Sequence, residues 1–180
     1  MVQSVAAYVP LWLVRQILAG SLPVPGETIS LEAAVLFADI SGFTPMAEAL
    51  ARVGRRGAEE MTQNLNDTFS ATIARIIAYG GEVAAFGGDA ILAFFERQAG
   101  QTPQEIAWRA LTCALEMRRA MEPFARIETS GGPFSLRMKF GLSFGRIIIV
   151  NVGSPAYGLE FIIAGTPVDR SASNENYAKS

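Results

Sequence analysis

Two aspartates, Asp39 and Asp89, lie beside short apolar segments and are the best candidates for chemistry in this sequence. Asp39 follows the apolar run 33–38, which is short enough for a buried strand. Asp89 follows Gly87 and Gly88, which permit the backbone angles of a tight hairpin turn between two apolar strands. Asp39 alone would more simply cap the helix that follows it. If the strands are neighbours, however, the two carboxylates can hold paired magnesium ions whose coordination is completed by phosphate oxygens.

The segment after Asp39 has the composition of a phosphate-binding turn. Ser41, Gly42 and Thr44 provide turn and cap chemistry ahead of a helical pattern, with Phe43 between them. The first N–H groups of a helix have no partner within the helix and lie at its positive dipole end, where they bind phosphate. An acid followed by such a turn predicts metal-assisted phosphoryl chemistry.

The remaining pattern predicts the elements that must position these groups. Thr102, Pro103 and Glu105 form a helix start with a capping box. In chain order, we expect a short helix over 45–51, a polar loop over 52–57, a long amphipathic helix over 58–78, a helix over 103–121, strands over 135–144, 147–152 and 160–164, with a turn at 145–146, and a last helix from 165. This order predicts an α+β fold with a mostly antiparallel sheet and helices on one face.

Composition excludes several classes of function. The chain has 180 residues, of which 50% are hydrophobic, and a net charge of −2, so it can form a sizeable core but has no basic footprint for nucleic acid. It contains no His, which excludes imidazole bases and His-bound zinc. The single Cys113 cannot form an internal disulfide and lies in an apolar helical pattern, as expected of a reduced cytoplasmic protein.

The first 30 residues form a separate N-terminal region in this interpretation. Residues 5–19 are apolar but too short to span a bilayer, and they contain Pro10 and Arg15. Pro10 suits the first turn of a helix that docks on this domain or on a partner. The prolines and glycines of 20–26 then predict a linker. We therefore expect a helix and linker over 1–30, a domain over 31–180, and no membrane span.

Together, the two motifs resemble those of class III nucleotide cyclases. Residues 35–44 are similar to the first metal-binding motif of that family, and 86–95 to the second, including the hairpin. The likeness extends from about Leu31 to the last residue and is particular to the first cyclase domain of soluble adenylyl cyclase-like bacterial proteins. It implies a ferredoxin-like, palm-type core, and it implies that one or more C-terminal strands of the family fold are missing from this sequence.

The resemblance also implies a set of roles. Asp39 and Asp89 match the metal-binding aspartates, Ile40 matches the position whose backbone carbonyl helps hold an ion, and the backbone of Ser41, Gly42, Phe43 and Thr44 matches the phosphate loop. Two Mg²⁺ or Mn²⁺ ions are the expected cofactors. The family reaction is attack of the ribose 3′-oxygen on the α-phosphate of ATP, which yields cyclic AMP and pyrophosphate; GTP is the less favoured substrate here.

Several family positions carry other residues. Ala85 stands where a base-recognising or bicarbonate-holding Lys is expected, and Ala172 stands in place of the nearby Arg that helps to hold bicarbonate in the family. Asp169 and Ser173 replace the Asn and Arg that orient ribose and stabilise the transition state. Base recognition is therefore expected from a second cyclase domain, in cis or in trans.

Three functions fit this pattern. The first is the metal-supplying half of a two-domain cyclase, with the isolated chain nearly inactive. The second is a catalytically inactive pseudo-cyclase domain that serves regulation or dimerisation. A diguanylate cyclase is the third, although Gly87-Gly88-Asp89 continues as Ala90-Ile91 and lacks the adjoining acid and aromatic pair.

Overall fold

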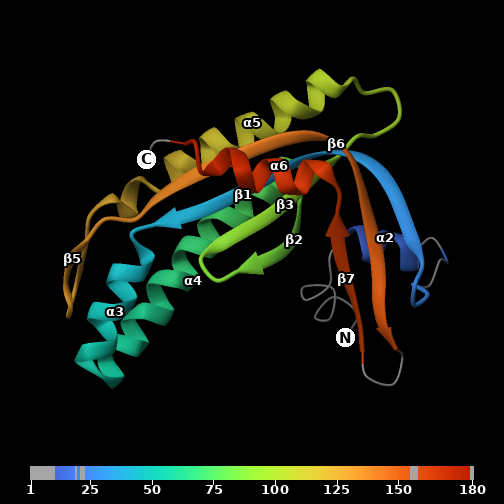
Figure 1. The fold of residues 1–180 in the computed structure, drawn as a ribbon. Helices are drawn as coiled ribbons and strands as arrows, with labels where there is room; N and C mark the ends of the chain where they lie inside the picture. The colour runs from blue at the N-terminus through green and yellow to red at the C-terminus, as the bar shows by residue number, and fades with distance from the viewer. Residues whose placement is uncertain (1–10, 19, 21–22, 155–157, 179–180) are drawn as a thin grey trace.

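The fold centres on one five-stranded antiparallel sheet. The structure is a computed structural model that describes residues 11–18, 20, 23–154 and 158–178 (Figure 1). In spatial order, the strands are β2 (Glu82–Gly87), β3 (Ala90–Glu96), β1 (Thr28–Ser41), β6 (Arg137–Ser154) and β7 (Gly158–Ala164). All four neighbouring pairs are antiparallel, which confirms the predicted α+β architecture.

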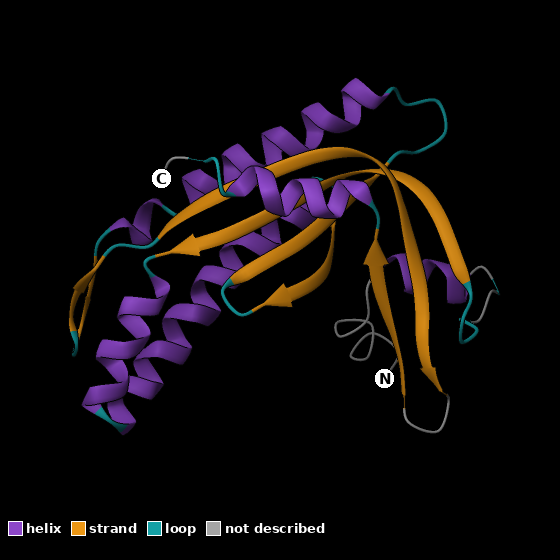
Figure 2. Cartoon of the chain, viewed as in Figure 1, coloured by secondary structure: helices purple, strands orange, loops and turns teal. Residues whose placement is uncertain are grey.

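Helices connect the strands, as the sequence pattern predicts (Figure 2). The capping box that begins α5 is present, because Glu105 N–H donates to the Thr102 hydroxyl and Thr102 N–H donates to the Glu105 carboxylate. A small second sheet of two strands projects from one end. The bounds are α2 (Leu11–Leu18), α3 (Phe43–Val53), α4 (Arg55–Ala78), α5 (Pro103–Ala120), the 3₁₀ turn η1 (Glu122–Ala125), β4 (Ile127–Thr129), β5 (Gly132–Phe134) and α6 (Thr166–Glu175).

Successive side chains of β1 point to opposite faces of the sheet, so the hydrophobic core has two parts, one on each face. Leu36 and Ile40 pack in the larger cluster, to which α4 and α5 contribute. Val35 points to the opposite face and packs in a smaller cluster with Val168 of α6. The expected placement of helices on one face therefore describes α4 and α5, whereas α6 covers the face on which Asp39 lies.

Strand β6 is longer than predicted. The sequence pattern predicts two strands, over 135–144 and 147–152, with a turn at 145–146, but β6 runs unbroken through that turn. Continuous pairing with β1, from Arg137 opposite Ser41 to Val150 opposite Thr28, keeps this segment extended. The local Gly-Arg turn signal was therefore wrong because a long-range partner overrides it.

The interruption predicted over 52–57 is also much shorter than expected. Only Gly54, at φ 84°, separates α3 from α4. Arg55 and Arg56 belong to the first turn of α4 and pair with Glu59 and Glu60 one turn later. Such i,i+4 pairs support the exposed start of a helix, so the three-arginine loop was a wrong prediction.

Part of the N-terminal region lies within the described residues. A helix is present over Leu11–Leu18, as predicted, whereas Pro10 and residues 21–22 of the linker lie outside the described residues. Strand β1 begins at Thr28, shortly before the expected boundary at residue 31. No helix among the described residues has the length and apolar character needed to cross a membrane.

Cys113 of α5 is fully buried in the core, and the reactivity of its thiol can be used to test this burial. Burial raises the pKa of its thiol to about 12, so almost no reactive thiolate exists at neutral pH. We expect a thiol reagent at neutral pH to leave the folded protein unmodified and to label it rapidly in denaturant. Rapid labelling of the native protein would contradict this burial.

Candidate active site

The sheet brings the two predicted aspartates together. Asp39 is paired in register with Ala90 of β3, and Asp89 is the residue immediately before Ala90, in the turn between β2 and β3. The two carboxylates interact electrostatically. The condition on which the sequence argument depended, that the two strands are neighbours, is therefore met.

The surroundings raise the pKa of the Asp39 carboxyl above its ordinary value. Burial is the largest cause, followed by the negative charges of Asp89 and Glu175, while Lys139 acts in the opposite direction. Among the described residues, neither aspartate side chain forms a hydrogen bond or a salt bridge with the protein. Two carboxylates that repel one another and lack a protein cation in contact are suited to a divalent ion.

The donor set fits magnesium or manganese. Carboxylate oxygens are hard ligands of the kind these ions prefer. No group of three or more His, Cys, Asp or Glu side chains is arranged to hold an ion within the described part of the chain. The protein thus offers a pair of carboxylates, which leaves coordination positions for phosphate oxygens and water.

The predicted phosphate turn follows Asp39 directly. Ser41 ends β1, Gly42 adopts φ 94°, and α3 begins at Phe43. A Cβ atom at Gly42 would lie 2.3 Å from the Ser135 carbonyl oxygen, so only glycine fits this turn. No side chain caps α3 and its first turn contains no acid, so its leading N–H groups are available to an anion.

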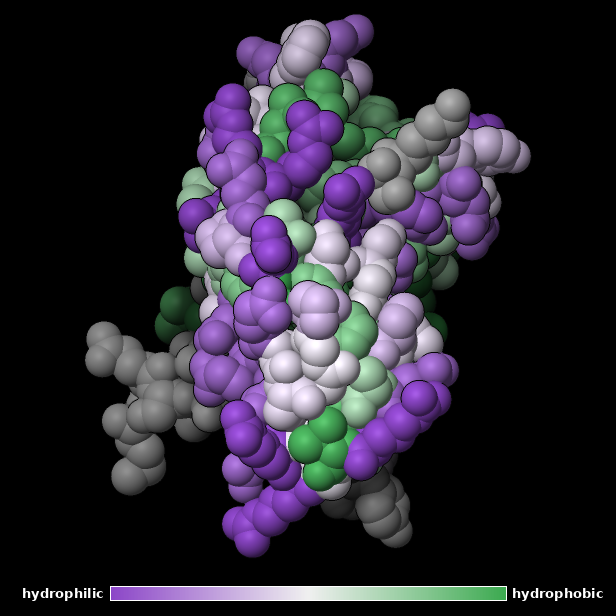
Figure 3. Space-filling model, turned by 90° about the vertical axis from the view of Figure 1, so that its left-hand side faces the viewer, coloured by the Kyte–Doolittle hydropathy of each residue, from purple (hydrophilic) through white to green (hydrophobic). Residues whose placement is uncertain are grey.

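The surface at this end of the molecule is polar. Figure 3 views the side where α3, α4 and β5 lie in Figure 1, and hydrophilic side chains dominate its rim around a paler centre. The hairpin turn at Gly87 and Gly88 is exposed, and a Cβ atom at either residue would meet no other atom within 4 Å. Open space therefore exists over the turn that carries Asp89.

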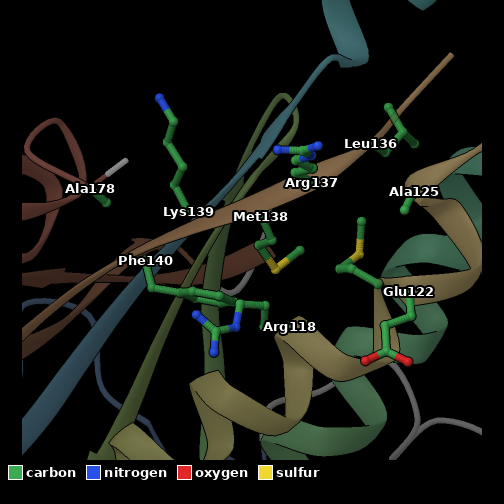
Figure 4. A pocket seen from close by; sticks show the side chains of 10 residues that line it. Arg118, Glu122, Ala125, Leu136, Arg137, Met138, Lys139, Phe140 and Ala178 are labelled. Atoms are coloured by element: carbon green, nitrogen blue, oxygen red, sulfur yellow. The ribbon is translucent and has the colours of Figure 1, made fainter. Parts of the chain in front are cut away.

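Lys139 is the site residue that the sequence interpretation missed. It is paired in register with Asp39 on the other side of β1, and its positive charge acts on Asp39. Figure 4 shows Lys139 and Arg137 on one side of β6, with Met138 and Phe140 on the other. The signal in the sequence was a pair of cations at alternate positions of an otherwise apolar strand.

The residues that replace the family's base and ribose groups do not compensate for them. Ala85 is exposed on edge strand β2 and carries no polar group. Asp169 and Ser173 are exposed on α6, where the Ser173 hydroxyl donates to the backbone carbonyl of Asp169 at 2.9 Å. The described residues thus assemble a carboxylate pair, a glycine turn with an uncapped helix start, and Lys139, but no group for base recognition at positions 85, 169 and 173.

A hollow of about 400 Å³ lies along the start of β6 (Figure 4). Residues of α5, η1 and β6 line it, and these include Arg118, Glu122, Met138 and both cations of the strand, Arg137 and Lys139. Neither Asp39 nor Asp89 lines it. The hollow therefore does not contain the carboxylate pair, although Lys139, which is paired in register with Asp39, borders it.

Comparison with known proteins identifies relatives of the same kind. Adenylate cyclase type 10 of Oryctolagus cuniculus is 32% identical over 147 residues, which make up 81% of this chain and 9% of that protein. A bacterial light-regulated adenylyl cyclase of known structure has a TM-score of 0.76 at 25% identity, over 97% of this chain and 48% of that one. The guanylyl cyclase Cya2 has a TM-score of 0.66 at 27% identity, over 87% and 74% of the two chains. No protein-family model matches.

The similarity to known cyclases and the placement of the two aspartates indicate the same family. The chain spans only a small part of the rabbit enzyme and about half of the light-regulated one. Over the shared part, the sheet places two aspartates at neighbouring strand ends, beside a glycine turn that opens a helix. The chain therefore belongs to the class III nucleotide cyclase domain family.

Proposed function

We propose that this domain is the metal-supplying half of a cyclase active site that converts ATP to cyclic AMP and pyrophosphate together with a second cyclase domain. The observation that carries the proposal is the register of β1, which places Asp39 between the Asp89 turn on one side and Lys139 on the other. Carboxylates, a phosphate turn and a cation converge there. GTP remains the alternative substrate, because the groups that choose the base are expected from the partner.

Each group has a role in this proposal. Asp39 and Asp89, with the backbone carbonyl of Ile40, hold two Mg²⁺ or Mn²⁺ ions, which when bound acidify the ribose 3′-hydroxyl and offset phosphate charge. The N–H groups that follow Gly42 bind phosphate oxygens, and Lys139 pairs with the same anion. Because Asp39 is inside a strand that is paired on both sides, its backbone is held in place before substrate arrives.

The test uses this chain assembled with a partner cyclase domain, assayed with ATP and GTP in Mg²⁺ and Mn²⁺. We expect metal-dependent cyclic AMP formation that falls by at least about two orders of magnitude in Asp89→Asn. The isolated chain should show almost none, because the partner's groups are absent. The matched control is Asp67→Asn, an exposed α4 residue. Undiminished turnover in Asp89→Asn would refute the metal-supplying role.

A catalytically inactive regulatory or dimerisation domain is the second candidate. The observation that favours it is that Ala85, Asp169 and Ser173 stand where the family's Lys, Asn and Arg are expected, and the Ser173 hydroxyl is bonded within its own helix. Titration of the assembled protein with Mn²⁺ and nucleotide separates the two candidates. Metal-dependent nucleotide binding supports the active half-site, and its absence with both ATP and GTP supports the pseudo-cyclase.

A further inference from the structure

We propose that Arg137 is a second phosphate-binding cation that makes this half-site selective for the triphosphate chain over shorter phosphates. The inference rests on the proposed function and adds to it a residue that determines specificity. Arg137 and Lys139 lie two residues apart in β6, so their side chains point to the same face of the sheet. Arg137 is the first residue of the strand, at the end opposite to the part that pairs with β7.

The pairing register places Arg137 beside the phosphate turn. Arg137 is opposite Ser41, just as Lys139 is opposite Asp39. Directly paired residues of an antiparallel sheet point to the same side, so both cations share the face of Asp39. Figure 4 shows the two side chains leaving β6 on one side, away from Met138 and Phe140. The cations thus form a row parallel to the path from the carboxylates to the start of α3.

The Arg137 guanidinium has no protein partner among the described residues, although Arg137 also borders the hollow beside α5 and η1. Its side chain is exposed, and within residues 11–18, 20, 23–154 and 158–178 it forms neither a hydrogen bond nor a salt bridge. By contrast, five other arginines of the described residues form salt bridges with Glu side chains: Arg55, Arg56, Arg97, Arg119 and Arg126. An unpaired guanidinium beside an uncapped helix start favours an anionic ligand, because both act on the same negative group.

Charge balance indicates which part of the ligand reaches Arg137. Two divalent ions balance a triphosphate of roughly four negative charges, so the two aspartates and the nearby Glu175 leave a surplus of negative charge. Lys139 and Arg137 offset most of that surplus. Since Lys139 lies beside the carboxylates and Arg137 lies beside the turn, Arg137 is placed for the terminal phosphates, which leave as pyrophosphate. Its planar guanidinium can bind two oxygens of one phosphate.

The experiment measures binding of Mn²⁺ complexes of ATP, AMP and inorganic triphosphate to this chain by calorimetry. We compare the wild type with Arg137→Gln, Arg137→Lys and Arg146→Gln. Arg146 is an exposed arginine of the same strand, paired in register with Glu32 rather than with the segment around Asp39, and is the matched control. We expect Arg137→Gln to weaken ATP and inorganic triphosphate about tenfold and AMP less than twofold. Arg137→Lys should recover part of the loss, and Arg146→Gln should resemble the wild type.

The outcomes distinguish this inference from the function on which it rests. Equal affinities for ATP in Arg137→Gln and the wild type would overturn the inference alone, provided that Asp89→Asn abolishes binding. An equal loss of AMP and ATP would also overturn it, because the residue would then lack selectivity for the phosphate chain. A wild type that binds none of the three metal complexes would overturn both proposals. Circular dichroism of each variant shows that the fold is retained.

Discussion

The substitution Asp39→Asn is expected to abolish metal-dependent activity and, at neutral pH, to raise the melting temperature of the metal-free protein. The activity of the assembled protein should fall by about two to three orders of magnitude, because half of the carboxylate pair is lost. The gain in stability has a different origin. Burial and the charges of Asp89 and Glu175 make the ionised Asp39 unfavourable in the folded state.

The pH dependence follows from the direction of the pKa shift. The folded state holds the Asp39 proton more tightly than the unfolded state, because the pKa of the carboxyl is raised from its ordinary value of 3.8. The free energy of unfolding therefore falls as the pH rises from the unfolded-state pKa of Asp39 to its higher folded-state pKa. Above the folded-state pKa, the full destabilisation by the ionised carboxylate is present. The neutral amide introduced by Asp39→Asn would bear no such cost.

Calorimetry of the wild type and Asp39→Asn at neutral pH and at a pH below 3.8 checks this expectation. The variant should melt higher at neutral pH, and the difference should shrink at the lower pH. Saturating Mn²⁺ should raise the melting temperature of the wild type only, because the proposed metal site needs both carboxylates. An equal metal-induced shift in both proteins, or a lower melting temperature of the variant at neutral pH, would contradict the argument.

The substitution Gly141→Ala is expected to be among the most destabilising single-methyl changes in the chain. Gly141 is buried in β6 under α6, and a Cβ atom there would lie 1.8 Å from the Ser171 carbonyl oxygen and 2.6 Å from the Glu175 amide nitrogen. Both are backbone atoms of a helix, so they cannot rotate away as a side chain would. The added methyl group must therefore move α6 off the sheet.

We expect a loss of about 3 kcal/mol, at the upper end of overpacking effects, and a fall in melting temperature of roughly 6–12 °C. Differential scanning calorimetry measures both. Gly87→Ala is the matched control, since a Cβ atom at Gly87 meets nothing within 4 Å. If the two variants melted at the same temperature, α6 could not rest on Gly141 as described.

Local patterns were sufficient to predict the backbone features around the candidate site residues. The apolar run before Asp39, the Gly-Gly turn before Asp89 and the turn at Gly42 are each contained in a few residues, and the structure keeps all three. That the two aspartates are neighbours required the sheet order, which the sequence supported only through its family resemblance. Helix α5 was predicted well because its capping box is also local.

The missed features depend on contacts between distant segments. Lys139 joins the site only through the register of β1 with β6, and no spacing within β6 reveals that register. The same pairing removes the predicted turn at residues 145–146. The start of α4 is a local exception: the sequence pattern suggested a loop for the three arginines at 52–56, whereas i,i+4 ion pairs with Glu59 and Glu60 allow the helix to begin at Arg55.

The long pairing of β1 with β6 has a consequence for the order of folding. The β2–β3 hairpin closes a short loop and can form soon after it is synthesised, whereas β1 meets β6 only across most of the chain. Asp39 and Asp89 can therefore approach one another before Lys139 and Arg137 reach them. During synthesis on the ribosome, the domain would acquire its acidic half first and its basic half last, so that the phosphate end of the site is completed only when the sheet itself is complete.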